Sequence, residues 1–327
     1  MTSIRKILVV IDPTAASQPA LERIAHLPRP VTAQLMLLIC DCEPNLGAGY
    51  AIAPEAFASA RASLLARHGK RLEALAAPLL AQGLDVRTDA CWDYPLHEAI
   101  IRKAVEWGAD LVVKDTHHHS VLRRSIFSNT DWNLIRQCPT QLLLVKPRAI
   151  GHVPAVVAAV DPLHPRDKAA SLDDRILTSA KELAHLLCGQ THVLHTFDIS
   201  PVIMTSADGM TMPIAVPIAE MAAELEKNHT EAVRALAEKH RIPRERVYVL
   251  QGHTRDVLVS STDRLRADVV VMGAVSRSAL ERLFIGSTAE AVLDKLSCDV
   301  LIVKPAGFAA SMEGVDSAVG VKGRVIF

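Results

Sequence analysis

The sequence contains few aromatic residues, which occupy 4% of its 327 positions, whereas 50% of the positions are hydrophobic. The core therefore has to be built mainly from Ala, Leu, Val and Ile, the usual composition of helices packed on a parallel sheet. The shortage of aromatic residues thus favours an α/β fold. Because a typical domain has about 100 to 200 residues, a chain of this length is expected to form two domains.

The sequence also lacks an excess of charge of either sign. Lys and Arg together number 36, as do Asp and Glu, so no overall field attracts nucleic acid phosphates or an anionic membrane. The opening MTSIRKILVVIDP has about seven apolar residues before a charge and a proline, too few for a membrane-spanning helix or a signal peptide. We therefore expect a cytoplasmic protein that binds no nucleic acid and does not insert into a membrane.

Several common signatures of catalysis and metal binding are absent. The chain has no G-x-x-x-x-G-K-[ST] sequence and no nucleophile elbow, so we assign no catalytic residue. Its six cysteines form no C-x-x-C pair and are expected to be reduced, packed thiols. The run His117–His119 has no cysteine or acidic cluster nearby that would complete a tetrahedral site, so no metal site is predicted.

What the sequence does contain is an internal repeat. Residues 115–147 align with residues 273–305 without a gap, at a constant offset of 158. The alignment gives eight identities in 33 positions, where unrelated segments would give only about two. The identical pairs are Ser120/Ser278, Leu122/Leu280, Arg124/Arg282, Thr130/Thr288, Leu143/Leu301, Val145/Val303, Lys146/Lys304 and Pro147/Pro305. Duplication of one domain explains this similarity.

Each copy alternates apolar, strand-like runs with amphipathic, helix-like segments, which is typical of parallel βαβ units. The first copy predicts strands at Ile4–Ile11, Gln34–Cys40, Asp85–Ala90, Leu111–Lys114 and Gln141–Val145. The second copy predicts strands at Ala155–Val160, Thr191–Thr196, Arg246–Leu250, Val269–Met272 and Val300–Val303. Right-handed crossovers would place helices on both faces of each sheet. Two tandem Rossmann-like domains, at 1–149 and 150–306, are therefore expected, followed by a tail at 307–327.

One segment of the second copy has the chemistry of a phosphate-binding loop. Gly273 closes the fourth strand, and Gly286, Ser287 and Thr288 precede a helical run. A helix start offers unpaired backbone N–H groups, a positive dipole end and, here, two hydroxyls to phosphate oxygens. The same residues also suit an ordinary helix N-cap, which remains the alternative. Their place beside the carboxyl ends of the first and fourth strands, where open α/β sheets bind ligands, favours a binding site.

This spacing resembles the G-x2-G-x9-G-[S/T] signature of the universal stress protein family, and the tandem layout is similar to that of its two-domain members. The resemblance covers residues 1 to 306 and implies adenine nucleotide alpha hydrolase-like domains that bind ATP, with Mg²⁺, at the strand ends. It places Asp161 near the base and ribose, and Gly273 and Ser276 beside the phosphates, and it includes Met272 among the nucleotide-binding residues. Gly286, Ser287 and Thr288 would contact phosphate oxygens. Ser276 departs from the signature, which has a second glycine at that position.

The first copy departs further from the signature. Asp115 and His118 replace the two glycines, and Ser128 with Asn129 replaces Gly-Ser. A carboxylate at the phosphate position would repel a polyanion, so we expect the first copy to bind no ATP in the family manner.

Two further functions remain open. The apolar segment Asp198–Met221 has four methionines and no basic residue, which suits either packing between the domains or a pocket for an amphipathic, acyl-bearing anionic metabolite. A weak ATPase is the other alternative.

The partners follow from the resemblance. The ligand is expected to be a small nucleotide-like or amphipathic molecule. In the family the fifth strand of each sheet pairs with its equivalent, so Gln141–Val145 and Val300–Val303 are expected to meet within one chain as a pseudo-dimer. A homodimer remains open.

Overall fold

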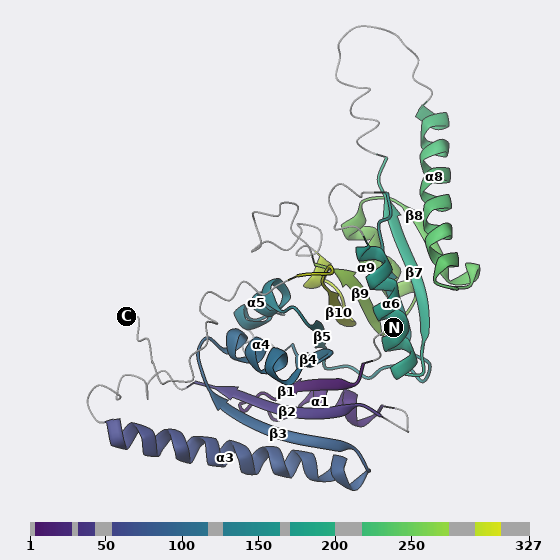
Figure 1. Cartoon of the computed structure of the whole chain (residues 1–327). Helices are drawn as coiled ribbons and strands as arrows, with labels where there is room; N and C mark the ends of the chain where they lie inside the picture. The colour runs from purple at the N-terminus through teal and green to yellow at the C-terminus, as the bar shows by residue number, and fades with distance from the viewer. Residues whose placement is uncertain are drawn as a thin grey trace, which may run out of the picture.

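The computed structural model describes most of the chain. The described residues are 4–27, 32–42, 54–116, 127–163, 171–199, 218–274 and 292–308. Within them, ten strands form one continuous sheet in the order β3-β2-β1-β4-β5-β10-β9-β6-β7-β8 (Figure 1). No helix in these ranges is long and apolar enough to cross a bilayer.

All ten predicted strands are confirmed, with bounds that differ by a few residues. The first five are β1 (Lys6–Val10), β2 (Gln34–Asp41), β3 (Asp85–Trp92), β4 (Leu111–Asp115) and β5 (Gln141–Val145). The second five are β6 (Ala155–Ala159), β7 (Gln190–Phe197), β8 (Val247–Gln251), β9 (Val269–Gly273) and β10 (Asp299–Val303). All pairs within each set of five are parallel.

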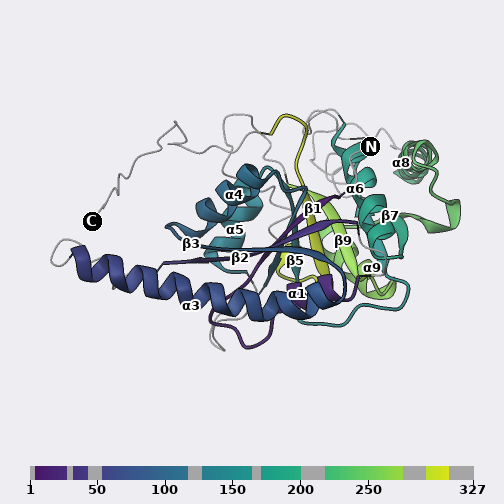
Figure 2. The same cartoon turned by 60° about the horizontal axis from the view of Figure 1, so that its bottom comes forward.

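Helices cover both faces of the sheet, as the sequence predicts. One face carries α1 (Pro19–Ala25), α3 (Pro54–Ala81), α6 (Leu172–Leu186) and α8 (Ile218–Lys239). The other face carries α4 (Leu96–Trp107), α5 (Asn129–Gln137) and α9 (Thr254–Arg264). A short 3₁₀ turn, η2 (Arg244–Arg246), leads into β8. The edge strand β3 runs beside α3, and α8 lies beside β7 and β8, at opposite ends of the sheet (Figures 1 and 2).

Alternation along the strands divides the core into two layers. In β1, Ile7 and Val9 pack under α1 and α3, whereas Leu8 and Val10 face α4 and α5. Each layer runs without interruption through both halves of the sheet. Because successive side chains of a strand point to opposite faces, a strand buried on both sides reads as the continuous apolar run seen in the sequence.

The two halves join through β5 and β10, as expected from the sequence. These strands pair antiparallel, with Leu144 opposite Val300, Leu143 opposite Leu301 and Leu142 opposite Ile302. The two halves therefore share one sheet. Because this junction is antiparallel, the first five strands run opposite to the second five. The carboxyl ends of the two sets therefore lie along opposite margins of the sheet.

Two equivalent lysines tie the halves together across this junction. The Lys146 ammonium group donates to the carbonyl oxygen of Leu296, and the Lys304 ammonium group donates to that of Arg136, 3.1 Å away. Arg136 lies in the last turn of α5, where carbonyl groups lack partners inside the helix. The repeated Lys-Pro pairs of the sequence are thus explained, because each lysine caps backbone carbonyls of the opposite half.

A buried ion pair lies beside the same junction. Nε of Arg23 lies 2.9 Å from Oδ2 of Asp299, and the side chains are only 7% and 1% exposed. The Asp299 carboxylate also accepts a 2.9 Å hydrogen bond from the backbone N–H of Lys146. Burial raises the pKa of Asp299 from 3.8 to about 6, although Arg23 opposes the rise.

We predict a pH-dependent stability difference between the wild type and the Asp299→Asn variant. Between pH about 4 and 6 the unfolded chain has lost the Asp299 proton while the folded protein keeps it, so rising pH favours unfolding. A rise in pKa from 3.8 to about 6 corresponds to about 3 kcal/mol. Urea denaturation over a pH range that extends about one unit beyond both pKa values should therefore show the wild type losing about 3 kcal/mol relative to the variant as pH rises. A difference that does not change with pH would contradict the buried titration.

Candidate functional site

The candidate site lies where the strand order of the second half reverses. β6 and β9 are neighbours, and the chain continues from β6 to β7 on one side and from β9 to β10 on the other. Asp161 follows β6 and Gly273 ends β9, so the structure brings these two predicted residues to the same edge of the sheet. Open α/β sheets bind ligands at such reversal points, beyond the carboxyl ends of the strands.

A hydrogen bond to its backbone fixes the position of Asp161. Its N–H donates a 3.0 Å hydrogen bond to Oδ1 of Asp173, in the first turn of α6. Its side chain is 37% exposed, and one carboxylate oxygen lies 3.9 Å from Nδ1 of His195. The carboxylate is thus accessible from solvent while the backbone beneath it is fixed.

A pair of buried histidines that the sequence did not reveal lies behind Asp161. Nδ1 of His195 donates to the carbonyl oxygen of Val160, 2.9 Å away, and Nε2 lies 2.7 Å from Nδ1 of His229. The His229 ring is nearly parallel to the rings of His195 and Phe197, with centroid distances of 4.8 and 4.9 Å. These contacts link α8 to the end of β7. Because His195 and His229 are 34 positions apart, no local pattern could have indicated their contact.

Gly273 has a clear packing role. A Cβ at this position would lie 2.7 Å from Cδ2 of Leu172 and 3.3 Å from Cδ1 of Ile176. Leu172 begins α6, so the missing side chain lets the start of that helix approach the end of β9 closely. Its expected place beside a phosphate stays a prediction. Met272, the preceding residue, is 6% exposed and belongs to the opposite core layer.

The remaining predicted residues of the loop, Ser276, Gly286, Ser287 and Thr288, lie outside the described residues, as do His117–His119 and residues 200–217 of the apolar segment. Among the residues that the structure describes, no group of three His, Cys, Asp or Glu side chains could hold a metal ion.

The first half fills the corresponding corner with its own carboxylate. Asp115, the equivalent of Gly273, is 2% exposed, and its Oδ1 accepts a hydrogen bond from the backbone N–H of Ala20 in the first turn of α1. The smaller and the larger residue of this helix-to-strand contact are therefore reversed between the two halves. Ala20 faces Asp115 in the first half, whereas Leu172 faces Gly273 in the second.

A second carboxylate occupies the helix start that corresponds to the predicted phosphate loop. Ser128 caps α5, with its Oγ 3.2 Å from the backbone nitrogen of Asp131, and the Asp131 carboxylate accepts a 2.8 Å hydrogen bond from the N–H of Ser128. Nζ of Lys114 lies 2.8 Å from the other Asp131 oxygen, and Asp131 is fully buried. The positive end of α5 is thus already neutralised from within the protein.

Asp12, the first-half equivalent of Asp161, forms a local turn. Its Oδ1 accepts hydrogen bonds from the backbone N–H and the hydroxyl of Thr14, at 2.7 and 2.6 Å.

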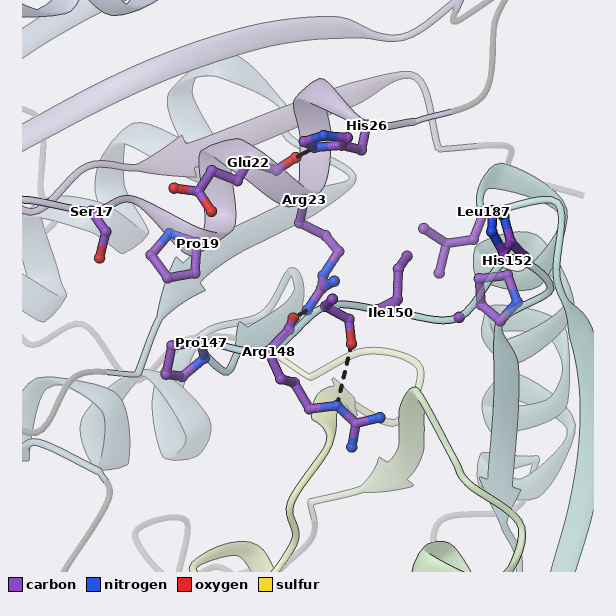
Figure 3. Close-up of a pocket in the computed structure, with 13 residues that line it drawn as sticks. Ser17, Pro19, Glu22, Arg23, His26, Pro147, Arg148, Ile150, His152 and Leu187 are labelled. Carbon is purple, nitrogen blue, oxygen red and sulfur yellow. Dashed lines mark hydrogen bonds between the residues drawn. The ribbon is translucent and has the colours of Figure 1, made fainter.

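A cleft of about 590 Å³ lies elsewhere, between α1, the linker and the end of α6 (Figure 3). Arg23 and Arg148 contribute most of its charge, with His26, His152 and Glu22 on its walls. Arg23 pairs with Asp299 and donates to the carbonyl oxygen of Arg148, 2.9 Å away. The cleft is thus lined by groups that hold the junction together, and it is separate from the edge formed by β6 and β9.

Comparison with known proteins gives a consistent result for both halves. The model of the universal stress protein family matches residues 3–146 and again residues 156–304. Universal stress protein E of Escherichia coli strain K12 is 26% identical over 319 residues, which cover 96% of this chain and 98% of that relative. Universal stress protein E of Photorhabdus laumondii is 27% identical over 310 residues, covering 94% and 97%.

Solved structures give the same picture. A functionally unknown protein from Pseudomonas aeruginosa PAO1 is 27% identical and has a TM-score of 0.68, with 92% of this chain and 93% of that chain covered. A universal stress protein from Archaeoglobus fulgidus has a TM-score of 0.62 at 14% identity, covering 91% and 98%, which is a likeness of fold alone.

We predict that Gly273→Ala lowers the free energy of unfolding by about 1–3 kcal/mol, because its Cβ would overlap Leu172. Urea denaturation measures the loss. Gly69→Ala in α3 is a matched control, because a Cβ there meets nothing within 4 Å. The control should be neutral or stabilising by up to about 1 kcal/mol.

Adding Leu172→Ala should remove the overlap, so the double variant should lose less stability than the sum of its single changes. Strict additivity of the two changes would contradict the packing role of Gly273.

Proposed function

Since this chain belongs to the universal stress protein family, we propose that it is a stress-response protein whose second half binds ATP or a related nucleotide. The ligand lies at the carboxyl ends of β6 and β9, and the protein acts by binding it. We also propose, from the same resemblance, the domain limits 1–149 and 150–306 and a cytoplasmic location.

One comparison between the halves supports this proposal most directly. Two internal carboxylates, Asp115 and Asp131, occupy the helix starts at the carboxyl edge of the first half. The second half has Gly273 and Ala289 at the equivalent positions, and Met272 in place of the cation Lys114. Ala289 supplies no carboxylate at the predicted phosphate loop, and a helix start that no internal carboxylate neutralises keeps its affinity for an external anion. The start of α6 is different, because Asp173 and Asp174 lie in its first turn.

The roles of individual residues follow the family pattern. Asp161, accessible at the end of β6, lies where a ribose or base would be held, and its carboxylate oxygens accept hydrogen bonds from hydroxyls. Gly273 and Ser276 are assigned to the phosphates, and Gly286, Ser287 and Thr288 to direct contacts with phosphate oxygens. Met272 supports this wall of the site from the core.

We predict that Mg²⁺–ATP binds the wild type in a calorimetric titration and that Leu172→Ala/Gly273→Asp weakens binding more than about tenfold. This double change copies the Ala20 and Asp115 arrangement of the first half, so it adds a carboxylate beside the phosphates without the overlap that Gly273→Asp alone would cause.

The matched control is the reverse exchange in the first half, Ala20→Leu/Asp115→Gly, which should leave the affinity unchanged. Equal losses in both variants would assign the effect to general destabilisation. Absence of both heat and a thermal shift at millimolar ATP would contradict the nucleotide proposal. A retained acyl-bearing mass in native mass spectrometry would instead favour the amphipathic metabolite.

A further inference from the structure

Two cysteines that are far apart in the sequence lie side by side in the first half. Cys40 of β2 and Cys91 of β3 are partners in the parallel register, and their sulfur atoms are 2.9 Å apart. In-register residues of adjacent strands project to the same face of a sheet. Neighbouring strands lie about 4.8 Å apart, which falls within the usual Cα separation of about 4.4–6.8 Å in disulfides.

The two thiols differ in their access to solvent. Cys40 is buried, with 7% exposure, whereas Cys91 is partly exposed on the outermost strand of the sheet. The hydrogen bond with Cys40 lowers the pKa of Cys91, and Lys103 assists. The same hydrogen bond and burial raise the pKa of Cys40. Cys91 is therefore the better nucleophile, and Cys40 is held in contact with it as a protonated thiol.

The surroundings do not suit a metal. The charged groups near the pair are already engaged, since Asp89 lies 2.7 Å from the Lys103 ammonium group and Asp93 pairs with Arg102. In the part of the chain that the structure describes, no third ligand joins the two sulfurs in a cluster. Two thiols in contact without a metal can give up two electrons and form a disulfide.

We propose that Cys40 and Cys91 form a redox-active dithiol that hydroperoxides oxidise to a disulfide, which joins the edge strand β3 to β2. The Cys91 thiolate attacks one peroxide oxygen, the O–O bond breaks, and Cys91 becomes a sulfenic acid while hydroxide leaves. The Cys40 sulfur then attacks the Cys91 sulfur, and the S–O bond breaks. The hydroxide from each step takes up a thiol proton, so hydrogen peroxide yields two water molecules.

The test uses the full-length chain, reduced, desalted and then treated with increasing hydrogen peroxide before alkylation and peptide mapping. We expect the intact mass to fall by two hydrogen atoms and one linked peptide to join Cys40 to Cys91. Alkylation of the reduced protein should label Cys91 faster than the exposed Cys188, despite the greater exposure of Cys188.

Three variants give sharper outcomes. Cys40→Ser should leave Cys91 with added oxygen atoms instead of a disulfide, because the resolving thiol is missing. Cys91→Ser should abolish the loss of mass. Cys42→Ser, two positions from Cys40, is the matched control and should oxidise like the wild type.

A wild-type peptide that links Cys91 to Cys42, or an unchanged mass at millimolar peroxide, would overturn the proposal. Peptide mapping of the wild type decides the matter even if a variant fails to fold.

Discussion

The structure depends on the antiparallel pairing of β5 with β10. This single junction turns two five-stranded sheets into one of ten strands and removes two exposed edges. The packing around it is reciprocal, because Lys146 and Lys304 each donate to backbone carbonyls of the opposite half. The ion pair of Arg23 with Asp299 adds a specific, buried contact at one end. The antiparallel pairing also fixes where the carboxyl ends of the strands of each half lie.

The two halves use the same scaffold differently. In the first half, the chain supplies its own anions to the starts of α1 and α5, through Asp115 and Asp131. In the second half, glycine and alanine stand at those positions, and the bulk that fills the corner comes from Leu172. The two halves therefore differ in the side chains at these positions, while the strands and core layers are retained.

Much of the fold could be predicted because its signals are local or repeated. Apolar runs bounded by charged residues, proline or glycine indicated all ten strands, and the resemblance to the family indicated the pairing of the two last strands. The site was harder. Asp161 and Gly273 were placed together correctly, but sequence spacing does not show what lies opposite a residue, so the contact of Gly273 with Leu172 was missed. The contacts of Cys40 with Cys91 and of His195 with His229 were missed for the same reason. Ser276, Gly286, Ser287 and Thr288 lie outside the described residues and stay predictions.

The covalent continuity of the junction has a consequence for stoichiometry. Two separate subunits joined by one strand pair dissociate on dilution, whereas two strands on the same polypeptide remain at a fixed, high local concentration. The short linker between residues 146 and 155 provides that tether. Every molecule therefore contains one first half and one second half, whatever the protein concentration. The two halves can therefore differ in sequence without a mixed population of assemblies arising.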